Sequence, residues 1–274
     1  MGVGQTSARH PKIGLLQLFR EGLLIYNGAM DWHTRYLQQA QWTAQLRAYL
    51  FQKAGLPTAQ HVLDLGCGTG ALLDGLSVKP GAAVFGLDLS LSALKQASSH
   101  ALEAPLTCAD GACLPYADSV FDLVFCHFVL LWTPDPLRVV TEMRRVTRPG
   151  GGVLALAEPD YGGRIDYPVE LAALGRWQAE SLRQQGAEPE MGRKLVGIFA
   201  RAGLERVETG VMGGEWTDPA SPKDAKMEWD VLETDLAGRV PLNEIQKMKT
   251  LDAAARQSGE RVLFVPTFYA WGAA

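Results

Sequence analysis

The ten residues from His61 to Gly70, H-V-L-D-L-G-C-G-T-G, constrain the fold of this chain more than any other stretch. The short apolar run Val62–Leu65 ends at a cluster of glycines, which predicts a fully buried parallel strand. Glycines remove side chains where the backbone must bend sharply or touch a ligand. We expect a helix over Ala71–Leu76, with the free N–H groups of its first turn directed into the glycine turn. The stretch therefore predicts a strand, a turn and a helix that hold a ligand with a nucleotide-like group.

The glycines alone leave two classes of cofactor open. Gly66-x-Gly68-x-x-Ala71 fits the relaxed dinucleotide fingerprint, in which the third position is Gly or Ala. Asp64, directly before the glycines, favours another ligand, because its charge repels a pyrophosphate and attracts a cationic amino group. Gly70 adds a third position of close approach that the dinucleotide pattern does not require.

A second carboxylate follows the next predicted strand. The segment A-A-V-F-G-L ends at Asp88, at the distance from the glycine turn where an acid accepts hydrogen bonds from both ribose hydroxyls. Both cofactor classes share this feature. The alternative role of Asp88 is to cap the helix that follows, which Ser90 can also do.

At this point the sequence resembles a known family. D-L-G-C-G-T-G is similar to the first motif of class I S-adenosylmethionine-dependent methyltransferases, of the small-molecule type that includes quinone and natural-product enzymes. The later segments Asp110–Ala112, Leu114-Pro115 and Arg148–Gly151 keep the order of that family. The resemblance implies that S-adenosylmethionine is the cofactor, that S-adenosylhomocysteine is the product, and that Asp110 meets the adenine amino group. The cofactor-binding residues that follow from the motifs and the resemblance are Asp64, Gly66, Cys67, Gly68, Gly70, Asp88, Leu89, Asp110, Gly111, Ala112, His127, Tyr26 and Arg35.

Strands and helices alternate along the rest of the chain, which predicts right-handed βαβ units and an α/β fold. Combined with the resemblance, this gives a Rossmann-like, seven-stranded, mainly parallel sheet with an antiparallel last strand, helices on both faces and helical lid additions. The predicted strands cover 61–65, 83–87, 105–108, 121–127, 152–158, 204–213 and 261–271, and the predicted helices between them cover 71–76, 90–101 and 135–147.

The domain organisation expected from this pattern has two parts. Residues 1–57 form an N-terminal helical cap or lid, and residues 58–274 form the cofactor-binding domain, with acceptor-side helical insertions near 162–200 and 217–260. Aromatic and polar residues in the first part either pack as a cap or contact the cofactor and the acceptor as a lid; they are Tyr26, Trp32, His33, Arg35 and Tyr36.

The catalytic residues are the least constrained part of the analysis. His127 falls at the carboxyl end of the fourth strand, where it is a cofactor contact, a general base or a packed histidine. Asp160 and Tyr161 follow the fifth strand, where they either face the acceptor or form an acidic turn. Methyl transfer by in-line displacement depends mainly on alignment and water exclusion, and it needs a base only if the acceptor must lose a proton. His33 is a further weak candidate for that base.

Composition limits the partners and the compartment. The chain of 274 residues is 47% hydrophobic and 20% charged with a net charge of -4, and it carries no basic stripe, which argues against nucleic acid. The four cysteines show no metal-ligand spacing, so we expect free thiols, no metal and a cytoplasmic location. We expect no membrane span, a monomer or homodimer, and a small apolar or aromatic acceptor suited to the seven tryptophans.

Two alternatives remain at this stage. An NAD-type oxidoreductase leaves Asp64 and Asp110 without a role. A non-catalytic S-adenosylmethionine-binding module keeps the fold and the cofactor site but shows no turnover.

Overall fold

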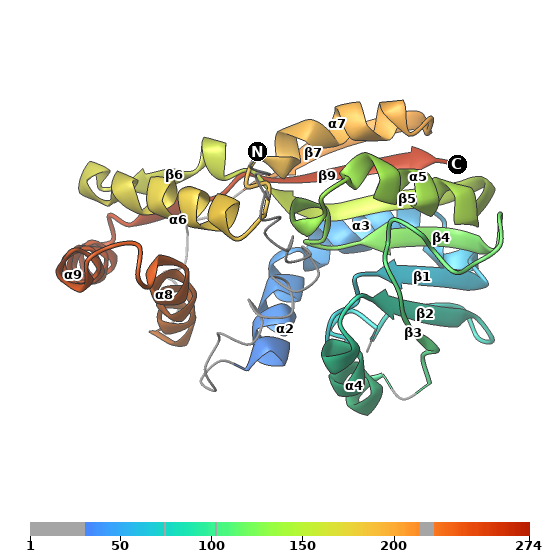
Figure 1. Cartoon of the computed structure of the whole chain (residues 1–274), viewed down its shortest axis with the longest axis horizontal. Helices are drawn as coiled ribbons and strands as arrows, with labels where there is room; N and C mark the ends of the chain where they lie inside the picture. The colour runs from blue at the N-terminus through green and yellow to red at the C-terminus, as the bar shows by residue number, and fades with distance from the viewer. Residues whose placement is uncertain (1–30, 74, 102, 214–221) are drawn as a thin grey trace, which may run out of the picture. The chain divides into compact units, whose positions relative to one another are not determined.

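One twisted sheet of seven strands carries the fold, in the order β3-β2-β1-β4-β5-β9-β7 (Figure 1). All neighbouring strands pair in parallel except β9, which is antiparallel to both β5 and β7. The predicted α/β fold with an antiparallel last strand is thus confirmed. The strands are β1 (His61–Leu65), β2 (Ala83–Asp88), β3 (Leu106–Cys108), β4 (Phe121–Cys126), β5 (Thr147–Pro159), β7 (Glu205–Met212) and β9 (Thr267–Ala273).

The computed structural model describes residues 31–73, 75–101, 103–213 and 222–274. Asp31–Ala274 forms one compact unit. Tyr26 and the expected helical content of residues 13–30 lie outside the described residues.

Helices cover both faces of the sheet because successive side chains of each strand point to opposite faces. On β4, Leu123 and Phe125 pack with Leu50 and Phe51 of helix α3 (Ala44–Lys53). Val124, between them, packs on the other face with helices α5 (Pro136–Val146) and α7 (Met191–Arg201). Helix α4 (Leu91–His100) lies along β2 and β3, and α2 (Trp32–Trp42) precedes α3.

Two local predictions were wrong. Residues 71–76 contain turns and no helix among the residues described there, and Gly75 has a φ of +88°, a left-handed conformation that stops a right-handed helix. The last predicted strand, 261–271, is two strands: β8 (Val262–Phe264) pairs with β6 (Ile165–Tyr167) in a separate sheet, and β9 begins at Thr267. Pro266 lies at the break, where its missing N–H ends strand pairing.

A second, smaller core lies among helices α6 (Ala172–Gln184), α8 (Pro222–Leu236) and α9 (Leu242–Ser258), drawn together at the left of Figure 1. These helices come from the two regions expected as insertions, whereas α7 packs on the main sheet. Buried ion pairs join this group to β6: Arg261 bonds both Asp166 and Asp252.

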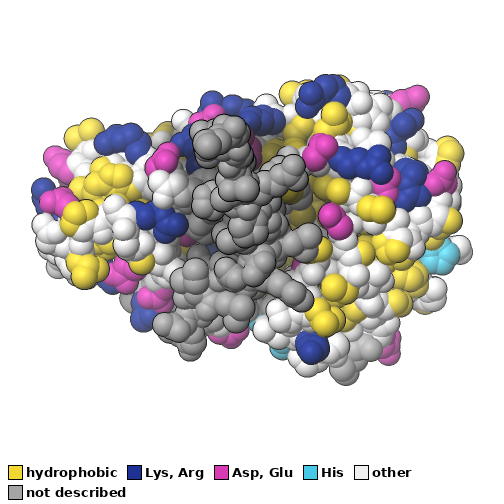
Figure 2. Space-filling model, viewed as in Figure 1, with side chains coloured by type: hydrophobic (Ala, Val, Ile, Leu, Met, Phe, Trp, Pro, Cys, Tyr) yellow, Lys and Arg dark blue, Asp and Glu magenta, His cyan; other side chains and the backbone are white. Residues whose placement is uncertain are grey.

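The surface of the described residues mixes both signs of charge. Figure 2 shows acidic and basic side chains beside one another on the viewed face. Among the described residues, no helix combines the length and the apolar character needed to cross a bilayer.

Candidate functional site

The glycine turn follows β1, and two of its glycines lie where a side chain has no room. Gly66 has a φ of +76°, and a Cβ atom there would lie 2.4 Å from Cγ2 of Val129. Gly68 has a φ of +53°, and its Cβ position is 3.3 Å from Cε2 of Tyr36 on α2. The positive φ values confirm the predicted sharp turn at both positions, and the expected approach of a ligand stays a prediction.

The rest of the glycine turn packs against helix α4 and is closed by a hydrogen bond of its own. Gly70 has a φ of +83° and lies against Ala97 of α4, and its N–H donates to the carbonyl oxygen of Cys67 at 2.9 Å. Burial raises the pKa of the Cys67 thiol, so this side chain is a neutral packing group. The expected contact of Cys67 with the cofactor stays a prediction.

Asp88 ends β2 and faces this turn. Its Oδ2 accepts a hydrogen bond from the Gly68 N–H, and its Oδ1 accepts one from the Ser90 N–H, both at 2.8 Å. Ser90 caps α4 through its own hydroxyl, which accepts from the Ala93 N–H. Capping, the alternative role of Asp88, is therefore filled by Ser90. Leu89, between them, is exposed.

Asp64 is a buried carboxylate on β1, with 2% of its surface exposed. Within the described residues, no hydrogen bond or ion pair reaches its carboxylate oxygens. Burial raises its pKa well above the ordinary value, the charge of Asp88 adds to this, and Arg47 opposes it. Two carboxylates thus face one turn, and this part of the site is suited to a cationic ligand group.

A cluster at the junction of α2 and α3 completes this end of the site, and the sequence analysis missed it. Arg47 donates to the hydroxyl oxygen of Thr43 at 2.8 Å and to the carbonyl oxygen of Ala40 at 2.6 Å. The same hydroxyl lies 3.0 Å from Nε2 of His127. Burial, followed by the charge of Arg47, lowers the pKa of His127 to about 3. His127 is therefore neutral at physiological pH, which makes it a poor general base.

Helix α2 packs against the glycine turn, and whether it serves as a cap or as a lid stays a prediction. Nδ1 of His33 lies 2.9 Å from the Thr69 hydroxyl oxygen, and its ring stacks on that of His100 with centroids 3.6 Å apart. Tyr36 lies over Gly68, and burial, with a contribution from Asp88, raises the Tyr36 pKa to about 12. Arg35 points elsewhere: its guanidinium stacks on Trp42 and experiences the charges of η3 (Tyr161–Gly163) and α8.

Asp110 follows β3 on the same edge of the sheet. Its Oδ1 accepts a hydrogen bond from the Ala112 N–H at 2.8 Å, and the residue is exposed. Gly111 lies against the side chain of Leu65 at the end of β1. The three predicted acids Asp64, Asp88 and Asp110 thus lie within two residues of the carboxyl ends of three adjacent parallel strands, which is where ligands bind in open α/β sheets.

A family comparison decides between the cofactor classes. A model of the methyltransferase domain family matches residues 63–155, which contain the glycine turn and all three acids. The chain carries a methyltransferase domain. This confirms the predicted family, and the NAD-type alternative receives no support.

Individual relatives agree with this assignment. The chain is 37% identical over 179 residues to the methyltransferase GfsG of Streptomyces halstedii, covering 63% of this chain and 62% of that protein. It is 36% identical over 110 residues to the ubiquinone biosynthesis O-methyltransferase of Vibrio cholerae, covering 38% and 44%. The matched part spans about half the length of these curated relatives.

A solved structure supports the fold of the methyltransferase domain. An S-adenosylmethionine-dependent methyltransferase from Thermotoga maritima superimposes with a TM-score of 0.53 at 15% identity, covering 95% of this chain and 99% of that one.

Two acids at the carboxyl end of β5, Glu158 within the strand and Asp160 directly after it, are both hydrogen-bonded. The carboxylate of Asp160 accepts two hydrogen bonds from Arg193, at 2.5 and 2.7 Å. Glu158 is fully buried and accepts the N–H groups of Val129, Leu130 and Leu131 at 2.8 to 3.0 Å. Burial raises the pKa of Glu158 to about 7, and the three donors offset only part of the rise.

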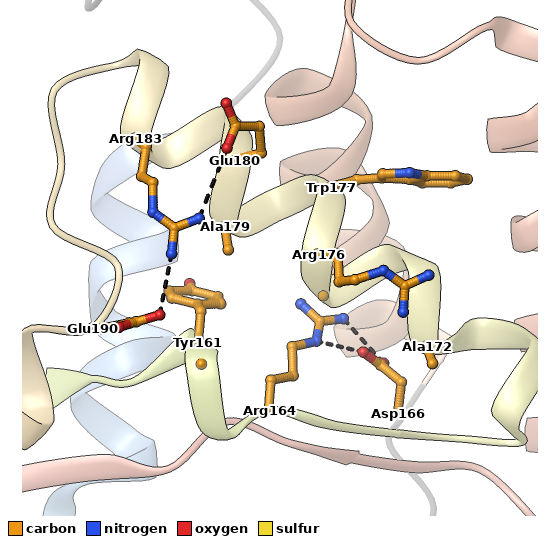
Figure 3. A pocket seen from close by; sticks show the side chains of 12 residues that line it. Tyr161, Arg164, Asp166, Ala172, Arg176, Trp177, Ala179, Glu180, Arg183 and Glu190 are labelled. Carbon is orange, nitrogen blue, oxygen red and sulfur yellow. Dashed lines mark hydrogen bonds and ion pairs between the residues drawn. The ribbon is translucent and has the colours of Figure 1, made fainter.

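Tyr161, the remaining catalytic candidate, lines a pocket of about 650 Å³ between η3, β6 and α6 (Figure 3). Burial raises the pKa of its hydroxyl, which stays protonated at neutral pH. In this pocket Arg164 is paired with Asp166, and Arg183 lies between Glu180 and Glu190. Among the described residues, no group of His, Cys, Asp and Glu side chains is arranged to hold a metal ion.

Proposed function

We propose that this protein transfers a methyl group from S-adenosylmethionine to a small apolar or aromatic acceptor. The observation that carries the proposal is Asp64, a buried carboxylate without a hydrogen bond among the described residues, at the turn it shares with Asp88. Burial favours the protonated form of the Asp64 carboxyl, and a cationic group beside it would favour the ionised form. The ammonium group of S-adenosylmethionine is such a cationic group.

Residues around the turn suit the remaining groups of this cofactor. Its amino-acid carboxylate suits Arg47, which experiences the charge of Asp64 and donates hydrogen bonds from the facing helix. The ribose hydroxyls suit Asp88, and the adenine amino group suits Asp110. The glycine backbone at Gly66 and Gly68 presents no side chain of its own to the ligand. Together, these charged residues offer a partner to each polar part of S-adenosylmethionine, from its amino-acid end to its base.

The chemistry of the bound cofactor is that of a methyl group activated by a positive sulfur. The protein has to align this group with the acceptor and exclude water, and alignment alone contributes roughly 7–11 kcal/mol in well-oriented reactions. The neutral ring of His127 adds no positive charge beside a sulfonium. We assign Asp160 to positioning, because Arg193 engages both of its oxygens.

An apolar or aromatic acceptor is proposed from the aromatic residues around this edge. Trp32 and Tyr36 of α2 have ring centroids 5.8 Å apart, and Trp132 and Phe128 follow β4. The name of the Vibrio cholerae relative, an O-methyltransferase of ubiquinone biosynthesis, agrees with a small-molecule acceptor.

Calorimetric titration tests the cofactor. We expect S-adenosylmethionine and S-adenosylhomocysteine to bind, and NAD to bind at least tenfold more weakly. Tight binding of NAD alone would overturn the proposal.

A screen with methyl-labelled S-adenosylmethionine over quinols, phenols and amines tests turnover. Transfer of label distinguishes the enzyme from the non-catalytic binding module, which binds the cofactor and transfers nothing.

A further inference from the structure

Arg35 is the one buried arginine among the described residues that lacks a carboxylate partner. Only 8% of its surface is exposed. The two other arginines with deeply buried side chains are paired: Arg164 bonds Asp166, and Arg261 bonds both Asp166 and Asp252. No acidic oxygen of the described residues lies within ion-pair distance of Arg35. Since a guanidinium keeps its proton in proteins, this buried charge has no carboxylate counter-ion among the described residues.

The contacts that the described residues make with Arg35 hold it in place and use only part of its hydrogen-bond donors. One terminal nitrogen donates to Oε1 of Gln38 at 2.5 Å, and Nε2 of Gln38 donates to Oδ1 of Asp224 on α8 at 2.7 Å. The guanidinium lies 4.7 Å from the centroid of the Trp42 ring. Stacking occupies a face of a guanidinium and leaves the N–H groups along its edge able to bind a carboxylate in two places.

The surroundings of Arg35 separate it from the cofactor's amino-acid end. The groups whose electrostatic effect raises the pKa of Arg35 are Tyr161 in η3 and Glu228 and Asp235 on α8. Glu228 is already paired with Arg256, and Asp235 accepts from Gln178. Asp64, by contrast, raises the pKa of Arg47 electrostatically. Arg35 therefore faces the segment that follows β5 and the helices of the second core.

We propose that Arg35 binds a carboxylate of the methyl acceptor, so that the acceptor is an apolar or aromatic molecule carrying an acidic group. This inference rests on the proposed function for the existence of an acceptor. The bound carboxylate supplies the missing counter-charge and takes the N–H donors that Gln38 leaves free. Gln38 and Trp42 then act as positioning residues for the guanidinium.

Arginine side-chain NMR tests the binding step without a known acceptor. The protein is labelled with 15N-arginine and saturated with S-adenosylhomocysteine, and the Nε–H signals of Arg35 and Arg164 are assigned from the R35K and R164K variants. Benzoate is then titrated, with benzamide as the neutral molecule of the same shape. We expect a saturable shift of the Arg35 signal with benzoate, none with benzamide, and none at the paired Arg164.

Calorimetry on the variants separates this inference from the proposed function. R35K should weaken benzoate binding at least tenfold and change the affinity for S-adenosylhomocysteine less than twofold. Equal shifts with benzoate and benzamide, or no shift of the Arg35 signal, would overturn the inference even where the cofactor binds. Failure of S-adenosylhomocysteine to bind the wild type would instead overturn the proposed function. The wild-type titration decides the outcome even where R35K does not fold.

Discussion

The main-chain N–H of Gly68 donates a hydrogen bond to Oδ2 of Asp88 at 2.8 Å, which joins the glycine turn after β1 to the end of β2. The other oxygen of Asp88 accepts from the Ser90 N–H. The carboxylate thus has a structural role in shaping the turn in addition to its proposed role toward the ribose. Experiments on Asp88 have to separate these two roles.

Replacement of Asp88 by alanine should weaken S-adenosylmethionine binding more than tenfold, or about 1.4 kcal/mol, measured by calorimetry. Asp122 provides a matched control, because its Oδ2 also accepts two backbone N–H groups, from Gln60 and His61, at the opposite end of β1. D122A should lower the free energy of unfolding and leave cofactor affinity unchanged. Equal affinity losses in the two variants would remove the ribose assignment.

Binding of S-adenosylmethionine should release a proton from Asp64. Burial raises the pKa of this carboxyl in the free protein, and an ammonium group beside it would lower the pKa. Affinity should therefore decrease as the pH falls through the raised pKa. Calorimetry in buffers of different ionisation enthalpy measures the protons released. D64N should abolish this component, and an identical proton release in D64N would contradict the assignment.

Glu158 should make stability fall as the pH rises. Its pKa of about 7 in the folded chain exceeds the ordinary 4.5, so between these values the folded state holds a proton that the unfolded state has lost. Urea unfolding across this range should show the decrease, and E158Q should remove it. In E158Q the amide NH2 group replaces one accepting oxygen, so one backbone N–H loses its acceptor. This loss should lower the free energy of unfolding by about 1–3 kcal/mol.

Glu142 gives the opposite sign and serves as the control for Glu158. It bonds Arg145 and accepts the Leu114 N–H, and these contacts lower its pKa. Its contribution to stability is present above the ordinary pKa of 4.5 and is lost at lower pH. If E142Q and E158Q changed the pH profile in the same direction, the burial argument for Glu158 would fail.

His127 should remain uncharged across the physiological range. Its pKa is lowered from 6.5 to about 3, so the free energy of unfolding should fall as the pH drops from about 6.5, where the unfolded histidine takes up its proton first. NMR of the ring carbons should show no titration between about pH 5 and 8. R47M, which removes the neighbouring charge, should raise the pKa while burial keeps it below the ordinary value. Titration of His127 near pH 6.5 in the wild type would restore the general-base interpretation.

Alanine at Gly66 should be far more damaging than alanine at Gly75. Both residues have positive φ values, which cost a side chain roughly 1–2 kcal/mol. Only Gly66 also meets a neighbour, Val129, at 2.4 Å, whereas nothing lies within 4 Å of the Cβ position of Gly75. Overpacking should add about 1–3 kcal/mol to the loss of stability in G66A. The V129A/G66A double variant should recover part of that loss, and no recovery would show that the contact is not responsible.

The sheet and the acids at its edge were predictable because the signals are local. Each of β1, β2 and β4 is a short apolar run that ends at a glycine or a polar residue, and parallel strands bring their carboxyl ends to one edge. Asp64 and Asp88 could therefore be placed together from the sequence alone.

The rest of the site depends on packing between distant segments. Thr43 meets His127 across 84 positions of sequence, and no local signal pairs these two residues or marks Arg47 as facing the site. Similarly, Asp160 follows β5 as predicted, but its pairing with Arg193 arises because α7 packs against the main sheet. Local turn chemistry explains the two wrong elements: Gly75 prevents the helix over 71–76, and Pro266 divides the last strand.

The crystal structure of the complex with S-adenosylhomocysteine tests the central claim most directly. The account predicts the ammonium group within hydrogen-bond distance of Asp64, the carboxylate on Arg47, and the ribose hydroxyls on Asp88. A ligand whose amino-acid end lies away from Asp64, or whose ribose makes no contact with Asp88, would contradict it.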